Sequence, residues 1–353
     1  MDDLWEWLSE KMERYRASED YDRYSVGIGF QYGAEMIHTN PENALSFFEK
    51  TRDRANELGE PWWALLCEHW SCQTMLYYSG QIDEARRIAE ASIEIVDGGE
   101  DYADFPQRVC LHDDRANALQ TIDPVGGHDQ IIADCDYIDR EGSRLESCSH
   151  CARSLRIDDA IAHGDLDIAE SVSLDGLGRC RSNTASHYVP QYMTALCRIS
   201  RLRNRWDKLL HWAAAGEQYY GKMGDDLSNI ELLMWHALAL LTTGDVSASR
   251  AAYLRARQAD RQTRHIQTVG YYDALADYHE LSGRFGAAID AHARQIESRT
   301  GAAYVECRSR LARVRLMRVL GRAVDAEVDL LRAAAAGLKD PSIVMAELDA
   351  ALA

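Results

Sequence analysis

The sequence predicts an all-α solenoid of about eight helix–turn–helix repeats with a capping helix at each end. Three observations support this prediction. Only six prolines occur in 353 residues, and long stretches rich in Ala, Leu, Arg and Glu favour helix. Turn-forming residues recur at a nearly constant interval along the chain. Short amphipathic segments at both ends can cover the apolar faces that a stack of repeats leaves exposed.

The turn positions establish the repeat. Their spacing lies between 38 and 43 residues, and the eight anchors are Asn40, Gly80, Asp123, Gly164, Asn204, Gly244, Gly283 and Gly321. A helix-period segment precedes the anchors, as in 62–78, 193–202, 230–241 and 305–320, and a second helix follows, as in 83–95 and 286–297. Gly or Asn suits an anchor because the turn needs a left-handed backbone conformation.

Each turn carries two further signals. An apolar residue follows two positions after the anchor and is expected to seal the turn: Ile82, Val125, Leu166, Trp206, Val246, Phe285 or Ala323. Five positions after the anchor, a small residue lets the two helices approach closely: Ala85, Ala169, Ser249, Ala288 or Ala326. Asp83, Asp165 and Asp245 are placed to cap or charge the second helix.

Some repeats depart from this pattern. Glu42 stands in the apolar position of the first repeat, His128 in the small position of the third, and Leu209 in that of the fifth. The register is therefore weakest over residues 98–142, where a longer loop is expected.

The turn sequences identify a resemblance. Gly80-Gln-Ile-Asp-Glu-Ala85, Gly164-Asp-Leu-Asp-Ile-Ala169 and Gly283-Arg-Phe-Gly-Ala-Ala288 resemble the inter-helix turn of tetratricopeptide repeats. The period near 40 is similar to the long repeats of kinesin light chains and of bacterial signal-responsive regulators. The resemblance covers about residues 20–337. It implies a right-handed superhelix. Members of this family mostly bind peptides or protein surfaces, and some sense small ligands.

The predicted organisation is one array over residues 1–353. Residues 1–17, with Asp3 to Tyr15 as the helix, cap the first repeat, and residues 18–337 hold the repeats. Residues 338–353 form the second cap, with Asp340 as N-cap and Pro341 as the first residue of a short helix through Leu348.

Composition narrows the classes of partner. The net charge of −18 opposes binding to phosphate backbones and to anionic membranes, so neither nucleic acid nor membrane is an expected partner. The acidity either keeps the array soluble or suits a basic segment of a protein partner. No apolar run approaches the roughly 20 residues of a membrane span, and the acidic N-terminus is unlike a signal peptide, so a cytoplasmic location is expected. Nine cysteines without a secretory signal indicate reduced, packed thiols.

Two segments superficially suggest ligands. Cys148-Ser-His-Cys151, with Cys135 and Glu146 nearby, offers a zinc-like CxxC knuckle, but a second knuckle is missing. Cys67, Cys110 and Cys151 also occupy one repeat position, which favours packed thiols. Gly27-Ile-Gly-Phe-Gln-Tyr-Gly33 lacks the βαβ context of a dinucleotide site and fits close helix packing instead. We therefore expect no metal and no cofactor.

Catalysis is not expected either. His112-Asp-Asp114 and His163-Gly-Asp165 place acid–base groups side by side, but acid–base catalysis needs a shielded pocket that single-layer arrays seldom form. No nucleophile signature accompanies them.

The resemblance implies that the first helices line a concave, partner-binding groove. Carrying its positions over through the anchors gives Trp70, Thr74, Tyr77, Asp113, Asn117, Gln120, Arg198, Arg201, Met234, Asp273, Asp277, Glu280, Arg315 and Arg318, with Leu238 and Leu241 beside Met234. The charges either pair between repeats or match the charges of a bound peptide. In the second case Arg198 and Arg201 could bind carboxylates.

The predicted function is a non-enzymatic scaffold that binds a protein or peptide in this groove. Two alternatives stay open at this point: a sensor whose superhelix responds to a peptide or small ligand, and an accessory subunit of an effector encoded nearby. The sequence does not indicate an oligomeric state.

Overall fold

The computed structural model describes residues 21–99, 104–142, 146–180, 188–223, 230–263 and 266–353, together with residues 10 and 102. The N-terminal cap expected over residues 1–17 lies outside this part of the chain, apart from residue 10. Helices account for all regular elements of the described residues, and no strand occurs among them. The predicted all-α fold is confirmed.

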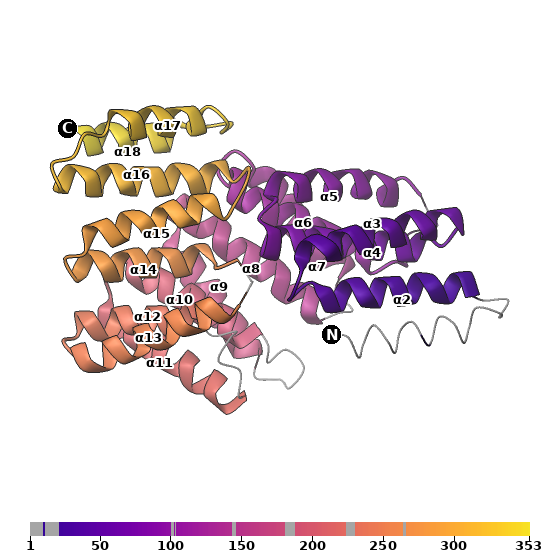
Figure 1. The fold of residues 1–353 in the computed structure, drawn as a ribbon, viewed down its shortest axis with the longest axis horizontal. Coiled ribbons are helices and arrows are strands. Elements are labelled where there is room, and N and C mark those ends of the chain that lie inside the picture. The colour runs from indigo at the N-terminus through magenta and orange to yellow at the C-terminus, as the bar shows by residue number, and fades with distance from the viewer. Residues whose placement is uncertain are drawn as a thin grey trace. The chain divides into compact units, whose positions relative to one another are not determined.

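Eight helix pairs follow one another along the described chain (Figure 1). The first helices of the pairs are α2 (Tyr21–Met36), α4 (Pro61–Thr74), α6 (Gln107–Ile122), α8 (Glu146–His163), α10 (Val189–Leu202), α12 (Ile230–Thr242), α14 (Val269–Leu281) and α16 (Ala303–Val319). A π-helical segment, η1 (Met75–Ser79), extends α4.

The second helices are α3 (Pro41–Glu57), α5 (Ile82–Asp97), α7 (His128–Glu141), α9 (Leu166–Arg179), α11 (Trp206–Met223), α13 (Val246–Gln262), α15 (Phe285–Glu297) and α17 (Asp325–Ala335). A last helix, α18 (Ser342–Leu352), lies in the predicted capping segment and packs on α16 and α17. It begins one residue later than expected, and Asp340 accepts a hydrogen bond from the Ser342 amide at 2.9 Å.

The chain divides into two compact units. Unit 1 comprises Met1–Ala118 with Arg264–Ile266, and unit 2 comprises Leu119–Thr263 with Gln267–Ala353. The division falls inside α6, in the stretch 98–142 where the sequence register is weakest. The single uninterrupted array expected from the sequence stays a prediction.

Within each unit, the helices pack in tandem. In unit 2, α7 contacts α8, α9 contacts α10, α11 contacts α12, and α15 contacts α16, so these second helices pack on the first helix of the next pair. First helices of successive pairs also touch, as α8 with α10, α10 with α12, and α12 with α14. Figure 1 shows α14, α15 and α16 stacked in chain order. This packing places α8, α10, α12 and α14 in one row, and α16 follows after α15.

The anchors explain the sharp turns. Six of the eight have positive φ, among them Asn204 at 54° and Gly244 at 91°. The left-handed conformation predicted for all eight is wrong for two of them. Asn40 has φ −152° and caps α3 through its side chain. The carboxylate of Asp123 instead accepts a hydrogen bond from the Gly126 amide at 2.9 Å. In these two turns a hydrogen bond from a backbone amide to a polar side chain stabilises the turn, whereas a left-handed backbone residue forms it elsewhere.

The small-residue position is confirmed in four repeats and wrong in one. Ala85, Ala169, Ser249 and Ala288 are fully buried between helices. Ala326 is exposed. The reason is that α17 starts four residues after its anchor, whereas α5, α9, α13 and α15 start two residues after theirs.

The apolar sealing position is less regular. Ile82 is 1% exposed and behaves as predicted, but Val246 is 63% exposed. Ala323 is exposed as well. Among the acidic caps, Asp245 accepts a hydrogen bond from the Ala248 amide at 3.0 Å, while Asp165 makes no side-chain cap.

Two other sequence features have plain packing explanations. The Gly27–Gly33 segment lies within α2, where a Cβ at Gly33 would stand 2.8 Å from Phe48. Four cysteines are packed among apolar neighbours: Cys67, Cys72, Cys197 and Cys307. Burial raises the pKa of the Cys67 thiol to about 12 and that of Cys307 to about 11. Both thiols therefore stay protonated at neutral pH. No helix among the described residues is long and apolar enough to cross a membrane.

Candidate functional site

The row of first helices in unit 2 carries a network of charged side chains. Arg198 on α10 donates to Asp158 on α8 at 2.5 Å. The Arg198 side chain is 26% exposed. The pKa of Arg198 is raised, because nearby carboxylates outweigh the burial that works against its charge. Asp158 lies six residues before its turn anchor, as Arg198 does, so applying the same offset to the fourth repeat would have found it.

A second ion pair spans two repeats. Arg201 on α10 donates to both carboxylate oxygens of Asp277 on α14, with one N–O distance of 3.0 Å. The helix between them in the row, α12, contacts both α10 and α14. This two-pronged geometry is the strong form of an arginine–carboxylate pair. Both groups are therefore already engaged within the chain.

Glu231 lies beneath this network at the start of α12. Its carboxylate accepts hydrogen bonds from Trp235 Nε1 at 2.9 Å and from Thr268 Oγ1 at 2.6 Å. Burial raises the pKa of Glu231, while these two donors and Arg198 lower it. Gly270 allows the approach, because a Cβ there would collide with the Glu231 carboxylate.

Asp273 on α14 is the exception in the network. It is partly buried, and no hydrogen bond or ion pair joins its carboxylate to another described residue. Three arginines whose charges act on Asp273 each have another carboxylate partner: Arg198 has Asp158, Arg201 has Asp277, and Arg308 has Glu347 at 2.7 Å. A fourth, Arg299, donates to the Gln267 carbonyl. Burial and the charge of Asp277 raise the pKa of Asp273 to about 6, against the opposing effect of the arginines. At pH 7.5 the carboxylate is nevertheless mostly ionised.

The C-terminal end of the row is bridged to α18. Arg315 lies 3.4 Å from Glu347, and Arg318 donates to the Ala351 carbonyl. Both arginines remain exposed, as does Glu280 on α14. These three predicted residues of the row are available to a partner.

Two predicted groove residues are not available. Met234 and Thr74 are fully buried, so the expectation that their side chains face a partner is wrong. Met234 belongs to the apolar core of unit 2 with Trp235 and Leu238. The Thr74 hydroxyl donates to the Trp70 carbonyl at 2.7 Å.

The other predicted positions are partly buried. Trp70 packs edge-on against Phe30, with ring centroids 6.0 Å apart. The Tyr77 carbonyl accepts a hydrogen bond from the Ile266 amide at 3.0 Å. On α6, Asn117 donates to the Asp113 carbonyl at 2.8 Å, and in unit 2 Gln120 donates to the Leu155 carbonyl at 3.0 Å. The groove role of these residues stays a prediction.

Unit 1 contains a histidine–carboxylate pair that the sequence did not indicate. Asp114 is fully buried and lies 2.7 Å from Nδ1 of His69, not against its sequence neighbour His112. Burial opposes the charged form of both groups, and the Asp114 carboxylate raises the pKa of His69. The two residues are 45 positions apart, so only the packing of α4 and α6 brings them together.

The cysteine pair does not form a metal-binding group among the described residues. Cys148 is buried, and the intervening His150 is hydrogen-bonded to the Tyr192 hydroxyl at 2.6 Å. The side chain of Glu146 lies outside the described part. The one three-ligand group that the described residues form contains no cysteine.

Comparison with known proteins shows no family for this chain. No protein-family model matches the sequence. No curated protein matches it. Twenty-six chains of solved structures are similar in fold. One belongs to the crystal structure of the APC/C hetero-tetramer Cut9-Hcn1; it is 11% identical, with a TM-score of 0.36, over 100% of this chain and 67% of the other.

Proposed function

We propose that this chain is a non-enzymatic scaffold, and that the first-helix row of unit 2 binds a segment of another protein through a basic side chain. The carboxylate of Asp273 carries this proposal. It lies in the row without a hydrogen bond or ion pair to another described residue, while Arg198, Arg201 and Arg308 are paired with other carboxylates. Arg299, whose charge also acts on Asp273, is hydrogen-bonded to the Gln267 carbonyl instead. A lysine or arginine of the bound segment would supply the missing partner.

The pairing of the charges in the row favours a basic partner over an acidic one. Arg198 and Arg201 would have to release Asp158 and Asp277 before binding a foreign carboxylate. Breaking a partly buried pair costs more than an exposed pair gains. Binding of a cation at Asp273 requires no such exchange. The overall charge of −18 would also attract a basic segment over a longer range.

The exposed charges along the row would set the register of the segment. Glu280 lies near Asp273 on the same helix, and Arg315 and Arg318 follow on α16. A segment with basic residues facing α14 and acidic residues facing α16 complements this order. Charges at the edge of an interface act mainly on the association rate and on specificity.

The test is quantitative affinity capture from the native host. The baits are the wild-type chain, Asp273→Asn and the control Asp290→Asn, which removes an exposed carboxylate from the second helix α15. We expect one protein to co-purify in stoichiometric amount with wild type and with Asp290→Asn, and to fall at least about tenfold with Asp273→Asn. Equal recovery on all three baits would show that Asp273 is not the contact.

A further inference from the structure

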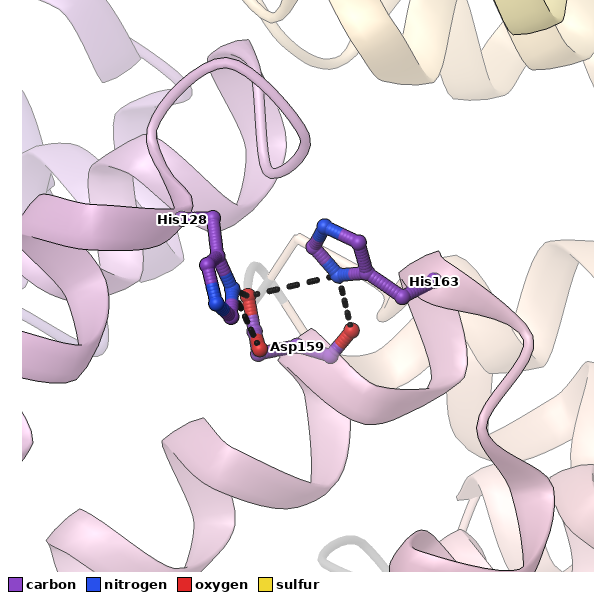
Figure 2. A group of neighbouring side chains, drawn as sticks. All are labelled: His128, Asp159 and His163. Atoms are coloured by element: carbon purple, nitrogen blue, oxygen red, sulfur yellow. Dashed lines mark hydrogen bonds and ion pairs between the residues drawn. The ribbon is translucent and has the colours of Figure 1, made fainter.

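A second cluster in unit 2 lies away from the charged row. His128 is the first residue of α7, and Asp159 and His163 lie one turn apart on α8. Nδ1 of His128 is 3.0 Å from one carboxylate oxygen of Asp159 and 3.1 Å from the other. Nδ1 of His163 is 3.6 Å from the carboxylate and 2.9 Å from the Asp159 carbonyl. Figure 2 shows the carboxylate between the two imidazoles.

The charge of Asp159 lacks a permanent counterion. Its residue is 5% exposed. The basic groups within ion-pair distance, among the residues that the structure describes, are these two imidazoles. No lysine or arginine among these described residues reaches the carboxylate, so a buried carboxylate lies between two nitrogens of a kind that binds metal ions. A cation between the three side chains would compensate it fully.

We propose that His128, Asp159 and His163 bind a divalent transition-metal ion, with Zn²⁺ as the first candidate. Two imidazoles and one carboxylate are an established donor set for such ions. Ligands about 2.1 Å from a metal stand about 3.0–3.4 Å apart around it. The separations of 3.0 and 3.6 Å to Asp159 approach this range, and the three ligand atoms all lie within 4.8 Å of one another.

Small side-chain movements complete the geometry. The His128 side chain is 45% exposed, so it can turn toward the ion without disturbing the core. His163 would give up its hydrogen bond to the Asp159 carbonyl and bind the metal. That carbonyl still accepts a backbone hydrogen bond within the α-helix. Asp159 is held on the buried side of α8 and fixes the site.

The surroundings leave room for further ligands. A pocket of about 490 Å³ adjoins the cluster, and Asp129 and Asp340 are among the residues that line it. Water or one of these carboxylates could complete the coordination from this side. The same pocket is bordered by Lys339, whose amide donates to Asp123 at 2.7 Å and so joins the α6–α7 turn to the segment before α18. An ion here would tie α7 to α8 beside this connection.

The repeat pattern agrees with a special role for His128. It occupies the position that holds a buried small residue in four repeats, and here it points to Asp159 instead. Sequence spacing alone could not join it to Asp159, which is 31 residues away.

Titration of the full-length, untagged chain with Zn²⁺ tests the proposal. The protein is first treated with a chelator and desalted, and binding is followed by calorimetry. We expect one ion per chain, and at least about tenfold weaker binding for His128→Gln and for His163→Gln. His211→Gln, an exposed histidine on α11, serves as the matched control and should bind as wild type does. Circular dichroism confirms that each variant is folded.

Substitution with Co²⁺ separates this site from the cysteine pair. Nitrogen and oxygen ligands give weak visible bands, whereas thiolates add an intense near-ultraviolet band. We expect no thiolate band, and an unchanged spectrum for the Cys148→Ser, Cys151→Ser double variant. The proposal fails if the chain binds no stoichiometric ion, if both histidine variants bind as tightly as wild type, or if only the cysteine variant loses binding.

Discussion

Arg201 on α10 donates hydrogen bonds to both carboxylate oxygens of Asp277 on α14, a residue 76 positions further along the chain. The pair skips one complete repeat, so α10 and α14 come within side-chain reach across α12. The centre of the first-helix row in unit 2 is thus closed by the chain's own charges. In the structure these two charges pair with each other, which is one of the two alternatives that the sequence left open for them.

A double-mutant cycle should detect this pair. With Arg201→Gln and Asp277→Asn, we expect a coupling free energy of unfolding of about 1 kcal/mol, since the pair is two-pronged but partly exposed. Denaturant titration of the four proteins measures the coupling. A value near zero would mean that the two groups do not meet in solution.

Asp273→Asn should stabilise the fold at neutral pH. The pKa of Asp273 is raised to about 6, so the folded chain holds this proton more tightly than the unfolded chain. Its contribution to stability is therefore full below the unfolded pKa and is lost as pH rises through about 6. We expect a gain of about 2 kcal/mol at pH 7.5 and a much smaller gain at pH 4.5.

Thermal unfolding of wild type and Asp273→Asn at both pH values tests this expectation, with Asp290→Asn as control. If Asp273→Asn destabilised the chain at pH 7.5, the carboxylate would have a cationic partner that supports it in the folded state. A stabilising substitution that weakens binding would identify Asp273 as a functional residue kept at a cost in stability.

Two glycines on α9 should respond in opposite ways. A Cβ at Gly176 would collide with the ring of Tyr192, which is 1% exposed and bonded to His150, so Gly176→Ala should destabilise the fold by about 1–3 kcal/mol. A Cβ at Gly178 meets no atom within 4 Å, and Gly178→Ala should stabilise the helix by about 0.5–1 kcal/mol. Equal effects of the two substitutions in chemical denaturation would contradict the close packing of α9 on α10.

The turn anchor Asn204 provides a test of the repeat itself. It has φ 54°, the one positive value among the described residues other than glycine. Asn204→Gly should be neutral or slightly stabilising, whereas Asn204→Ala should cost about 1 kcal/mol. The midpoint of thermal unfolding measures both. Comparable losses for Gly and Ala would show that the asparagine side chain, and not the backbone conformation, matters at this turn.

The fold was largely predictable because its signals are local. A left-handed anchor, a small residue five positions later and two helices of regular length depend on neighbours in sequence. Where the structure differs, another local device acts, such as the Asp123 side chain or the later start of α17. The prediction weakened at 98–142, where the chain divides into its two units.

The candidate site was less predictable because it depends on the curvature of the row. The offsets from the anchors placed Asp273, Asp277 and Arg201 on the same row, but they could not show which charges meet. They also treated Met234 as accessible, although its repeat is apolar enough to be buried between its neighbours. His128 and Asp159 come together through the packing of α7 on α8, which no sequence spacing encodes.

The affinity of the captured partner as a function of pH tests the central claim most directly. Calorimetry would compare wild type, Asp273→Asn and Asp290→Asn at pH 7.5 and pH 5.0. If a basic side chain pairs with Asp273, wild type and Asp290→Asn bind at least about tenfold more weakly at pH 5.0, where the carboxylate is protonated. Asp273→Asn then binds weakly at both pH values. Tight binding by Asp273→Asn at pH 7.5, or a wild-type affinity that does not change with pH, would contradict the account.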